Sequence, residues 1–493
     1  MTSTEPPLHP DACYLALKTR DARFDGSFFT GVTSTGIYCR PVCRVRTPRR
    51  ENCRFFAHAA QAEGAGFRPC LRCRPELAPQ ALRWSLQDAS AVLAQQAARL
   101  LDEPEAWTGD APSVEGLAQR MGVSDRHLRR IFEDHLGVSP LQYLQTRRLL
   151  NAKQLLADTP LPITQVALAS GFGSVRRFNA AFLAHYGLSP SAMRREGLDG
   201  SGACEVRLGY RPPYDADAML AFFRTRAIAG VEHVAARQLA RTLAIDAGGQ
   251  RREGWLTVDF DEAHCQVLLK VSESLLGVLP LVIRRVRAAF DLDADPHAIN
   301  ARLHGSFPLG DGLRVPGALS GYELAVRAVL GQQITVAAAR TLAQRLVQRF
   351  GVPIETPVPG LAQLFPAPEV LAAAEGDALG QLGIVRQRQA AIVAIARATA
   401  QGRLALHPGA DVATTTAALK ELPGIGDWTA QYIAMRALRW PDAFPAGDVA
   451  LHKALGVQQS RQPAREAEAA SQAWKPWRSY AVVRAWSALS QGA

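Results

Sequence analysis

The spacing of apolar positions predicts helices in two long parts of the chain. Apolar residues recur at about 3.6-residue spacing over Trp84–Leu101, which predicts a helix there. The same pattern predicts a long amphipathic stretch over Tyr322–Arg349, interrupted at 331–333. Polar residues over 103–112, and a run rich in Gly and Ser over 196–203, predict linkers. The chain is therefore expected to be divided into several parts.

A strand-like composition marks the middle of the chain. It covers three short runs, Arg241–Asp246, Trp255–Phe260 and Cys265–Val271. They follow a predicted helix over Asp215–Ala227. Together these elements predict a small α+β lobe, and nothing in its residues points to chemistry.

An internal repeat with an offset of about 50 residues lies between the two linkers. Each copy has an apolar pair, a glycine turn, a serine, an apolar stripe and a Gly-x-Ser-Pro end. The matching positions are Leu117 and Val166, Gly122 and Gly171, Ser124 and Ser174, Leu128 and Phe178, Phe132 and Phe182, and Gly137 and Gly187. The pattern predicts two helix-turn-helix units whose second helices are capped by Ser124 and Ser174.

The repeat resembles the AraC-type regulator domain, in which each unit places its second helix in the major groove of DNA. The resemblance implies DNA contacts by the arginines that face away from the apolar stripe. These are Arg126, Arg129, Arg130, Arg176 and Arg177. Such arginines read bases or only touch phosphates. A helical bundle that does not bind DNA is the alternative.

The composition adds the expectation of a nucleic-acid partner. The chain has 493 residues, enough for more than one domain, and a formal net charge of +11, which favours a polyanion. Its N-terminus lacks the features of a signal peptide. The longest apolar run, Leu275–Ile283, is too short to span a bilayer. We therefore expect a soluble, cytoplasmic protein with no membrane partner.

Four of the eight cysteines form two closely spaced pairs, Cys39 with Cys43 and Cys70 with Cys73. Two such pairs match a tetrahedral four-thiolate zinc site, and a cytoplasmic location favours metal chemistry over disulfides. The alternative is a set of small buried apolar side chains. That interpretation is kept for the other four, Cys13, Cys53, Cys204 and Cys265. The sequence therefore predicts one zinc ion and no organic cofactor.

The residues around these cysteines resemble the N-terminal domain of the Ada adaptive-response family. The matching stretches are Gly36-Ile37-Tyr38-Cys39-Arg40-Pro41-Val42-Cys43 and Gly66-Phe67-Arg68-Pro69-Cys70. The resemblance implies that the zinc cysteines repair DNA methylphosphotriesters and that Cys39 accepts the methyl group. A zinc-held thiolate is a nucleophile at neutral pH. Methylation removes one negative charge, and in that family tighter DNA binding then activates transcription. A purely structural zinc site is the alternative.

A glycine-rich turn, Leu422-Pro423-Gly424-Ile425-Gly426, precedes a predicted helix that resumes near Asp427. Gly424 and Gly426 allow a tight hairpin. The free N–H groups at the start of the next helix make a phosphate-binding geometry. On these residues alone an ordinary helix–helix turn is an equal alternative.

The wider stretch, from about Glu205 to the C-terminus, resembles the helix-hairpin-helix DNA glycosylases of the AlkA type. The resemblance implies that Asp448 is the catalytic carboxylate and that Trp428, Tyr432 and Trp486 line the pocket. Removal of a flipped, electron-poor base needs an anion beside the sugar and flat rings that stack on the base. Core packing is the alternative for the aromatic residues, and a helix N-cap is the alternative for Asp448.

Three departures from related patterns limit the predicted activity. The resembled family places a wedge, commonly leucine, where Gln333, or else Ile334, stands here. Gln gives less apolar contact than leucine in the gap left by an extruded base, and a polar turn is an equal alternative. Trp428 replaces the Schiff-base lysine of bifunctional relatives, so we expect base removal without strand cleavage. The Pro-Cys-His-Arg context of a second Ada acceptor does not occur, so no O6-methylguanine repair is expected.

These observations predict a multidomain, mainly α fold with four domains. We expect a small zinc-bound α+β domain over 1–85 and an all-α double helix-turn-helix domain over 86–198. An α+β lobe over 205–315 and a helix-hairpin-helix catalytic domain over 316–493 complete the expected order.

The predicted function is DNA alkylation repair and its regulation, by a monofunctional glycosylase joined to a methyl sensor and a transcription regulator. The expected partners are double-stranded DNA and alkylated DNA, with RNA polymerase as a further candidate. The alternative is a regulator whose glycosylase part only binds DNA, and Gln333 is the feature that favours it. A generic DNA-binding scaffold with structural zinc would require both sets of motifs to be accidental.

Overall fold

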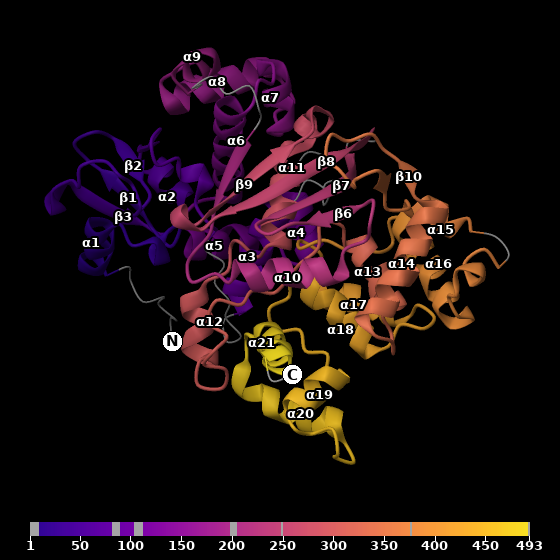
Figure 1. Ribbon diagram of the computed structural model, residues 1–493. Helices are drawn as coiled ribbons and strands as arrows, with labels where there is room; N and C mark the ends of the chain where they lie inside the picture. The colour runs from indigo at the N-terminus through magenta and orange to yellow at the C-terminus, as the bar shows by residue number, and fades with distance from the viewer. Residues whose placement is uncertain are drawn as a thin grey trace.

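The computed structural model describes residues 9–80, 89–102, 112–197, 205–247, 250–374 and 377–491. Figure 1 shows the N-terminal part beside the long helix α6, a five-stranded sheet near the centre, and the helices of the last third of the chain around the lower and right side. None of the helices in these residues is long and apolar enough to cross a membrane.

The N-terminal part is a four-stranded sheet in the order β3-β1-β2-β4, with one helix before β1 and another between β3 and β4 in the sequence. β1 pairs antiparallel with β2 and β3, whereas β2 and β4 pair in parallel, with Tyr38 opposite Pro69. The parallel pair brings the ends of β2 and β4 together. The elements are α1 (Pro10–Thr19), β1 (Phe29–Val32), β2 (Ile37–Cys39), β3 (Cys53–Phe56), α2 (Ala59–Gly64) and β4 (Arg68–Pro69).

Seven helices follow, and they confirm the two predicted helix-turn-helix units. Ser124 and Ser174 cap α5 and α8 as expected, each accepting a backbone N–H from the third residue along. The helix predicted over Trp84–Leu101 is seen from Ala89, and residues 81–88 lie outside the described residues. The helices are α3 (Ala89–Asp102), α4 (Val114–Met121), α5 (Asp125–Leu136), α6 (Pro140–Asp158), α7 (Ile163–Ala169), α8 (Val175–Tyr186) and α9 (Pro190–Gly197).

The predicted α+β lobe is an antiparallel sheet in the order β5-β9-β8-β7-β6. Its strands are longer than the sequence predicted, except at Cys265. Cys265 has a left-handed φ of 52° and ends a 3-10 turn, so β9 begins one residue later. The elements are β5 (Glu205–Gly209), α10 (Ala216–Arg226), β6 (Glu232–Val234), β7 (Gln238–Ala247), β8 (Gln250–Asp261), β9 (Gln266–Val271), α11 (Leu279–Ala289) and α12 (Pro296–Leu303).

The last third of the chain is helical around two apolar cores. One core lies among α13, α14, α16 and α18, and the other lies beneath α12 and α18 to α21. The predicted interruption is confirmed, since α13 ends at Leu330 and α14 begins at Val336. The elements are α13 (Gly321–Leu330), α14 (Val336–Phe350), β10 (Val352–Pro353), β11 (Gln363–Leu364), α15 (Pro368–Ala372), α16 (Arg386–Ala400), α17 (Val412–Lys420), α18 (Asp427–Arg436), α19 (Val449–Ala454), α20 (Pro463–Ser471) and α21 (Arg478–Gln491).

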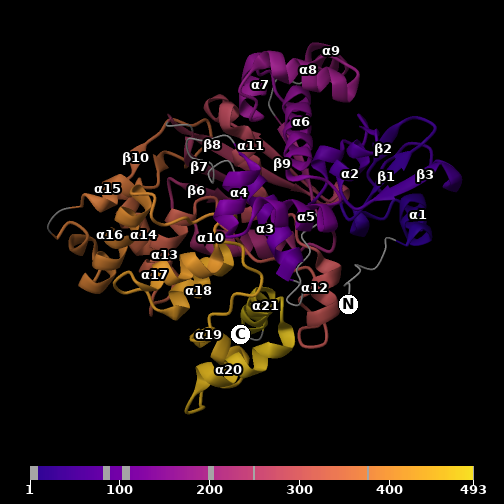
Figure 2. The same cartoon turned by 180° about the vertical axis from the view of Figure 1, so that it is seen from behind.

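The parts of the chain are tied together by buried contacts. The second helix-turn-helix unit shares one apolar core with the central sheet, and Phe178, Phe182, Val206 and Leu208 all belong to it. Figure 2 shows α3, α4 and α5 on the near side of the molecule, with the N-terminal sheet beside α5 and α6. The Lys153 ammonium of α6 reaches the Glu76 carboxylate at 2.6 Å. The N-terminal part therefore contacts the helix-turn-helix units, and the second of these units packs on the central sheet.

Candidate functional site

The hairpin between α17 and α18 needs its first glycine. Gly424 has a left-handed φ of 75°, and a Cβ there would lie 3.3 Å from the Ala391 Cβ and from the Gln387 carbonyl oxygen. Gly426 is the N-cap of α18 and is exposed, with no atom within 4 Å of a Cβ placed on it. The N-terminus of α18 therefore opens to solvent, which suits contact with a phosphate.

Asp448 lies at the N-terminus of α19, where its carboxylate both caps the helix and binds two tryptophan side chains. One carboxylate oxygen accepts the backbone N–H of Leu451 at 2.7 Å, which makes Asp448 the N-cap of the helix. The same oxygen accepts the indole N–H of Trp486 at 3.1 Å, and the other oxygen accepts that of Trp428 at 2.9 Å. The residue is 9% exposed. The cap that the sequence left as an alternative thus coexists with an aromatic site.

Three aromatic side chains surround this carboxylate. Trp428 and Tyr432 lie one turn apart on α18 and stack, with ring centroids 5.3 Å apart and planes inclined by 15°. Trp486 comes from α21, and its ring lies 6.4 Å from that of Tyr432 at 44°. All three side chains are half-buried, although Tyr432 and Trp486 also pack against the apolar cores. The structure therefore brings together all four residues that the sequence placed in one pocket.

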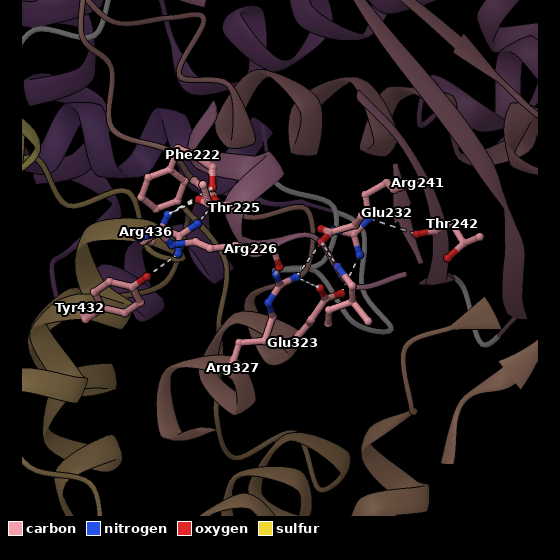
Figure 3. Close-up of polar contacts among 12 residues, drawn as sticks. Phe222, Thr225, Arg226, Glu232, Arg241, Thr242, Glu323, Arg327, Tyr432 and Arg436 are labelled. Atoms are coloured by element: carbon pink, nitrogen blue, oxygen red, sulfur yellow. Dashed lines mark hydrogen bonds and ion pairs between the residues drawn. The ribbon is translucent and has the colours of Figure 1, made fainter. Parts of the chain in front are cut away.

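The hydroxyl end of Tyr432 points toward the guanidinium groups of Arg436 and Arg226 (Figure 3). Arg436, one turn further along α18, donates to the Tyr432 oxygen at 2.5 Å. It also donates to the carbonyl oxygens of Pro316 and Gly317 at 2.8 and 3.1 Å. Arg226 of α10 lies beside Arg436. Burial raises the pKa of the Tyr432 phenol, but Arg436 and Arg226 lower it by more, so the pKa lies below its usual value.

The loop between α13 and α14 is hydrogen-bonded to the hairpin between α17 and α18. Gln332 donates its amide to the Gly424 carbonyl oxygen and to the Thr429 hydroxyl, each at 2.9 Å. Arg388 donates to the Gln332 carbonyl oxygen. Gln333 follows with a left-handed φ of 56° and an exposed side chain, whereas Ile334 is half-buried and packs on a core. Of the two wedge candidates, the outward-facing one is therefore Gln333.

The four predicted zinc ligands converge at the end of the β2–β4 pair. The sulfur atoms of Cys39, Cys43, Cys70 and Cys73 all lie within 4.8 Å of one another. Four thiolates about 2.3 Å from a tetrahedral zinc ion lie about 3.8 Å apart, which is within the separation of the four sulfur atoms here. Cys39 ends β2 and Cys70 follows β4 directly, so the strand pairing itself sets the site.

The four sulfur atoms differ in their hydrogen bonds. Backbone N–H groups donate to Cys43 from Val45, to Cys70 from Cys73, and to Cys73 from Arg40. Within the described residues no backbone N–H donates to Cys39. A thiolate that accepts a hydrogen bond is a weaker nucleophile, which makes Cys39 the candidate nucleophile among the four.

Arg40, next to Cys39, faces inward rather than toward solvent. Its guanidinium forms a two-point ion pair with Asp25 and donates to the Cys73 carbonyl oxygen at 3.0 Å. Arg44, Arg46 and Arg54, which follow Cys39 in the sequence, are exposed. The side chains of these three arginines are free to contact a phosphate, whereas Arg40 links Asp25 to the backbone at Cys73.

The predicted DNA-facing arginines of the helix-turn-helix units are all exposed. They lie on α5 and α8, opposite the buried stripe formed by Leu128, Phe132, Phe178 and Phe182. They are Arg126, Arg129, Arg130, Arg176 and Arg177. Their side chains therefore meet the steric requirement for contact with a DNA groove.

A large cavity of about 1420 Å³ lies apart from the Asp448 site. Side chains of α6, β7, α11 and the segment 404–409 line it, among them Arg147, Arg284 and Leu406. Asp448 and its three aromatic neighbours are not in its lining. The cavity lies among α6, β7, α11 and residues 404–409 and is distinct from the aromatic pocket.

Sequence reasoning missed several residues that shape the Asp448 site. Arg436 could have been found, since it stands four residues after Tyr432 on the same helix. Arg226, Gln332 and Arg388 come from distant segments, and no local pattern marks them. Val449 follows Asp448 and is 77% exposed, an unusual exposure for a large apolar residue beside a buried carboxylate.

Four protein-family models match the chain in sequence order. They are the metal binding domain of Ada over 12–76, a helix-turn-helix domain over 117–196, the AlkA N-terminal domain over 205–320, and the HhH-GPD superfamily base excision DNA repair protein over 326–479.

Known relatives match the whole chain or its second half. A probable bifunctional transcriptional activator/DNA repair enzyme AlkA from Mycobacterium tuberculosis is 36% identical over 500 residues, which is 98% of this chain and 97% of that protein. The DNA-3-methyladenine glycosylase 2 of Escherichia coli is 35% identical over 279 residues, 57% of this chain and 95% of that protein. A 3-methyladenine DNA-glycosylase structure from Archaeoglobus fulgidus matches with a TM-score of 0.48 and 20% identity, over 57% of this chain and 97% of that one.

Proposed function

The chain belongs to the family of bifunctional transcriptional activator/DNA repair enzymes of the AlkA type, and we propose that its second half hydrolyses the N-glycosidic bond of alkylated bases such as 3-methyladenine in duplex DNA. Its Ada, helix-turn-helix and HhH-GPD parts serve DNA alkylation repair and its regulation. One observation carries the proposal above all. The Asp448 carboxylate is held by two indole N–H groups beside the stack of Trp428 and Tyr432.

The reaction follows from the charge of the substrate. A purine in DNA that is alkylated at N3 or N7 is positively charged, and it must be flipped out of the duplex to be reached. Stacking against Trp428, Tyr432 and Trp486 stabilises such a base. When the bond from C1′ to the base nitrogen breaks, the electron pair leaves with the base, which becomes neutral. The sugar becomes an oxocarbenium ion, which the Asp448 carboxylate stabilises.

Water completes the reaction. Its oxygen bonds to C1′ while its proton is released, and the DNA strand stays intact.

Trp428 stands where a Schiff-base lysine would be required for strand cleavage, so we propose a monofunctional glycosylase. The exposed Gln333 is proposed to fill the gap left in the duplex, and the open hairpin at Gly424 and Gly426 to bind the backbone.

The substitution Asp448→Asn tests the glycosylase proposal because asparagine still caps a helix but carries no charge. We expect release of 3-methyladenine from methylated duplex DNA to fall at least about a hundredfold. Asp215→Asn is the matched control, because Asp215 also caps a helix and lies at the start of α10. A folded wild type that binds this DNA without releasing any base would favour the alternative function, a regulator whose glycosylase part only grips DNA.

We also propose that Cys39 removes methyl groups from DNA methylphosphotriesters. The Cys39 sulfur attacks the methyl carbon, a bond from sulfur to carbon forms, and the bond from carbon to the phosphate oxygen breaks. The phosphodiester anion leaves, and Cys39 remains as a methyl thioether. A bound zinc ion would keep the cysteine thiols deprotonated, and therefore nucleophilic, at neutral pH. The lack of a backbone donor on the Cys39 sulfur supports this choice among the four cysteines.

Methyl transfer is measured with a duplex that carries one labelled methylphosphotriester. We expect stoichiometric label on the wild-type protein and none on Cys39→Ala. The control is Cys53→Ala, a buried cysteine outside the zinc cluster. Equal labelling of the Cys39→Ala protein would show that another residue is the acceptor.

The helix-turn-helix units are proposed to bind promoter DNA through the exposed arginines of α5 and α8, and RNA polymerase is the proposed partner of the activator. We propose the domain limits 1–85, 86–198, 205–315 and 316–493 for these activities. If Arg129 and Arg177 contact phosphates, Arg129→Ala and Arg177→Ala should each weaken binding to DNA of any sequence. Each should also reduce the dependence of DNA affinity on salt concentration.

A further inference from the structure

The arginines behind the aromatic pocket carry more positive charge than the nearby carboxylates neutralise. Figure 3 shows the cluster, in which Glu232 and Glu323 lie between Arg241 and Arg327. Glu232 and Glu323 each form ion pairs with both of these arginines, at distances between 2.6 and 3.1 Å. Two carboxylates therefore balance two guanidinium groups.

Arg226 and Arg436 are left with neutral acceptors. Arg226 donates to the Phe222 carbonyl oxygen and the Thr225 hydroxyl, and its guanidinium lies 3.7 Å from the centre of the Phe222 ring. Arg436 donates to two carbonyl oxygens and to the Tyr432 oxygen. Among the described residues no carboxylate forms an ion pair with either arginine. Two cations thus meet at the oxygen of one phenol.

A buried cation without a counter-charge is costly, and guanidinium groups do not lose their proton in proteins. The phenol of Tyr432 is the group at this point that can supply a negative charge, by releasing its proton to solvent. The other charged groups near Tyr432 already have hydrogen-bond or ion-pair partners. Arg327 of α13 is ion-paired with Glu232 and Glu323, and the Asp448 carboxylate of α19 accepts hydrogen bonds from Trp428 and Trp486.

We propose that Tyr432 works as a tyrosinate, which makes the pocket selective for positively charged bases over neutral ones. The inference rests on the proposed glycosylase function and adds to it the charge class of the substrate. A tyrosinate ring attracts a cationic base more strongly than a neutral phenol does, because its negative charge spreads over the ring. A neutral purine gains nothing from this charge.

The same charge assists release of the product. Once the glycosidic bond has broken, the alkylated base is neutral, and its attraction to the Tyr432 ring falls. The substrate is therefore held more strongly than the product. The direction of the pKa shift agrees with this geometry, because burial alone would raise the pKa of Tyr432 and the two arginines lower it below its usual value.

The charge state is tested without any enzymatic assay. Ultraviolet difference titration of the full-length, zinc-loaded protein detects tyrosinate formation, and the chain has nine tyrosines, so Tyr432→Phe is needed to identify the signal. We expect one ionisation below the ordinary range of tyrosine that is absent from Tyr432→Phe. Arg226→Gln, at a half-buried position, should move that ionisation to higher pH. Identical titrations of wild type and Tyr432→Phe would overturn the proposal.

Selectivity is tested by single-turnover release of 3-methyladenine, which is positively charged while it is bonded to the sugar, and of hypoxanthine, which is neutral there. The ratio of the two rates should rise with pH as Tyr432 ionises in the wild type. In Tyr432→Phe it should be at least about tenfold lower and independent of pH. Equal loss of both activities would mean that Tyr432 only packs the pocket. Release of neither base by the wild type, with the tyrosinate titration intact, would instead contradict the glycosylase function.

Discussion

The side chain of Arg211 donates a hydrogen bond to the backbone carbonyl oxygen of Asp25, 186 residues earlier in the chain, at 2.8 Å. The same guanidinium donates to the carbonyl oxygens of Pro79 and Gln80 on the N-terminal side, and of Asp293 and Ala294 on the glycosylase side. Arg211 is 1% exposed. One buried arginine therefore joins the sensor part to the glycosylase lobe.

Arg211→Met should destabilise the whole protein, because it leaves five buried or partly buried carbonyl oxygens without their donor. We expect the free energy of unfolding to fall by about 3 kcal/mol or more. Urea-induced unfolding followed by circular dichroism measures the change. Arg207→Met on β5 is the control, since the Arg207 side chain is 59% exposed, and its effect should stay within about 0.5 kcal/mol. Similar effects of the two substitutions would mean that the buried contacts contribute little.

Asp448 is predicted to show two separable effects, one on catalysis and one on stability. Asp448→Asn and Asp448→Ala should both lower base release at least about a hundredfold. Only the alanine loses the cap of α19, so it should be less stable than the asparagine by about 1 kcal/mol. Thermal unfolding of both proteins beside single-turnover kinetics separates the effects. Asn and Ala variants of equal stability would show that the cap at Asp448 is not required.

Local elements of this fold were predictable from sequence because local chemistry determines them. The caps Ser124 and Ser174 act on N–H groups three residues away, and the paired cysteines mark a metal site by their spacing alone. Gly424 signals a turn that only glycine allows at its φ and close contacts. Each of these predictions depends on a few adjacent residues.

Contacts between distant segments were not predictable in this way. The indole groups on Asp448 come from residues 20 and 38 positions away, and only family resemblance placed Trp428 and Trp486 together. Nothing in the sequence marks the tie of Arg211 to Asp25. Arg226 and Phe222 of α10 lie beside Arg436 of α18 only through the packing of α10 in the fold. Such contacts depend on the packing of whole elements.

Gln332 should hold the loop before α14 in the shape that binds DNA. Gln332→Ala removes two hydrogen bonds to the hairpin, worth about 1 to 2 kcal/mol, so affinity for a duplex with an abasic analogue should fall about tenfold. Gln344→Ala is the matched control, because its exposed amide also donates to a backbone carbonyl, that of Ala229 at 3.1 Å. A loss of affinity shared by both variants would exclude a specific role for Gln332.

Gln333 combines an unfavourable backbone conformation with an exposed side chain. Gln333→Gly should raise the free energy of unfolding by about 1 kcal/mol, because glycine adopts a left-handed φ without strain. If the glutamine side chain fills the gap left by a flipped base, the same variant should release 3-methyladenine at least about tenfold more slowly. Unchanged base release from Gln333→Gly would remove Gln333 from the set of DNA contacts.

Removal of zinc should disrupt the N-terminal part and spare base release. The four thiols hold the ends of β2 and β4, whereas the helices around Asp448 pack on separate apolar cores. Thiol ligands must be deprotonated to bind zinc, so retention of the metal should fall as the pH is lowered. Cys43→Ser should lose zinc and Cys53→Ala should keep it, as measured by metal analysis beside 3-methyladenine release. If base release disappears with the metal, the glycosylase part depends on the sensor part for its folded state, and the contacts of Arg211 are the first place to look for that dependence.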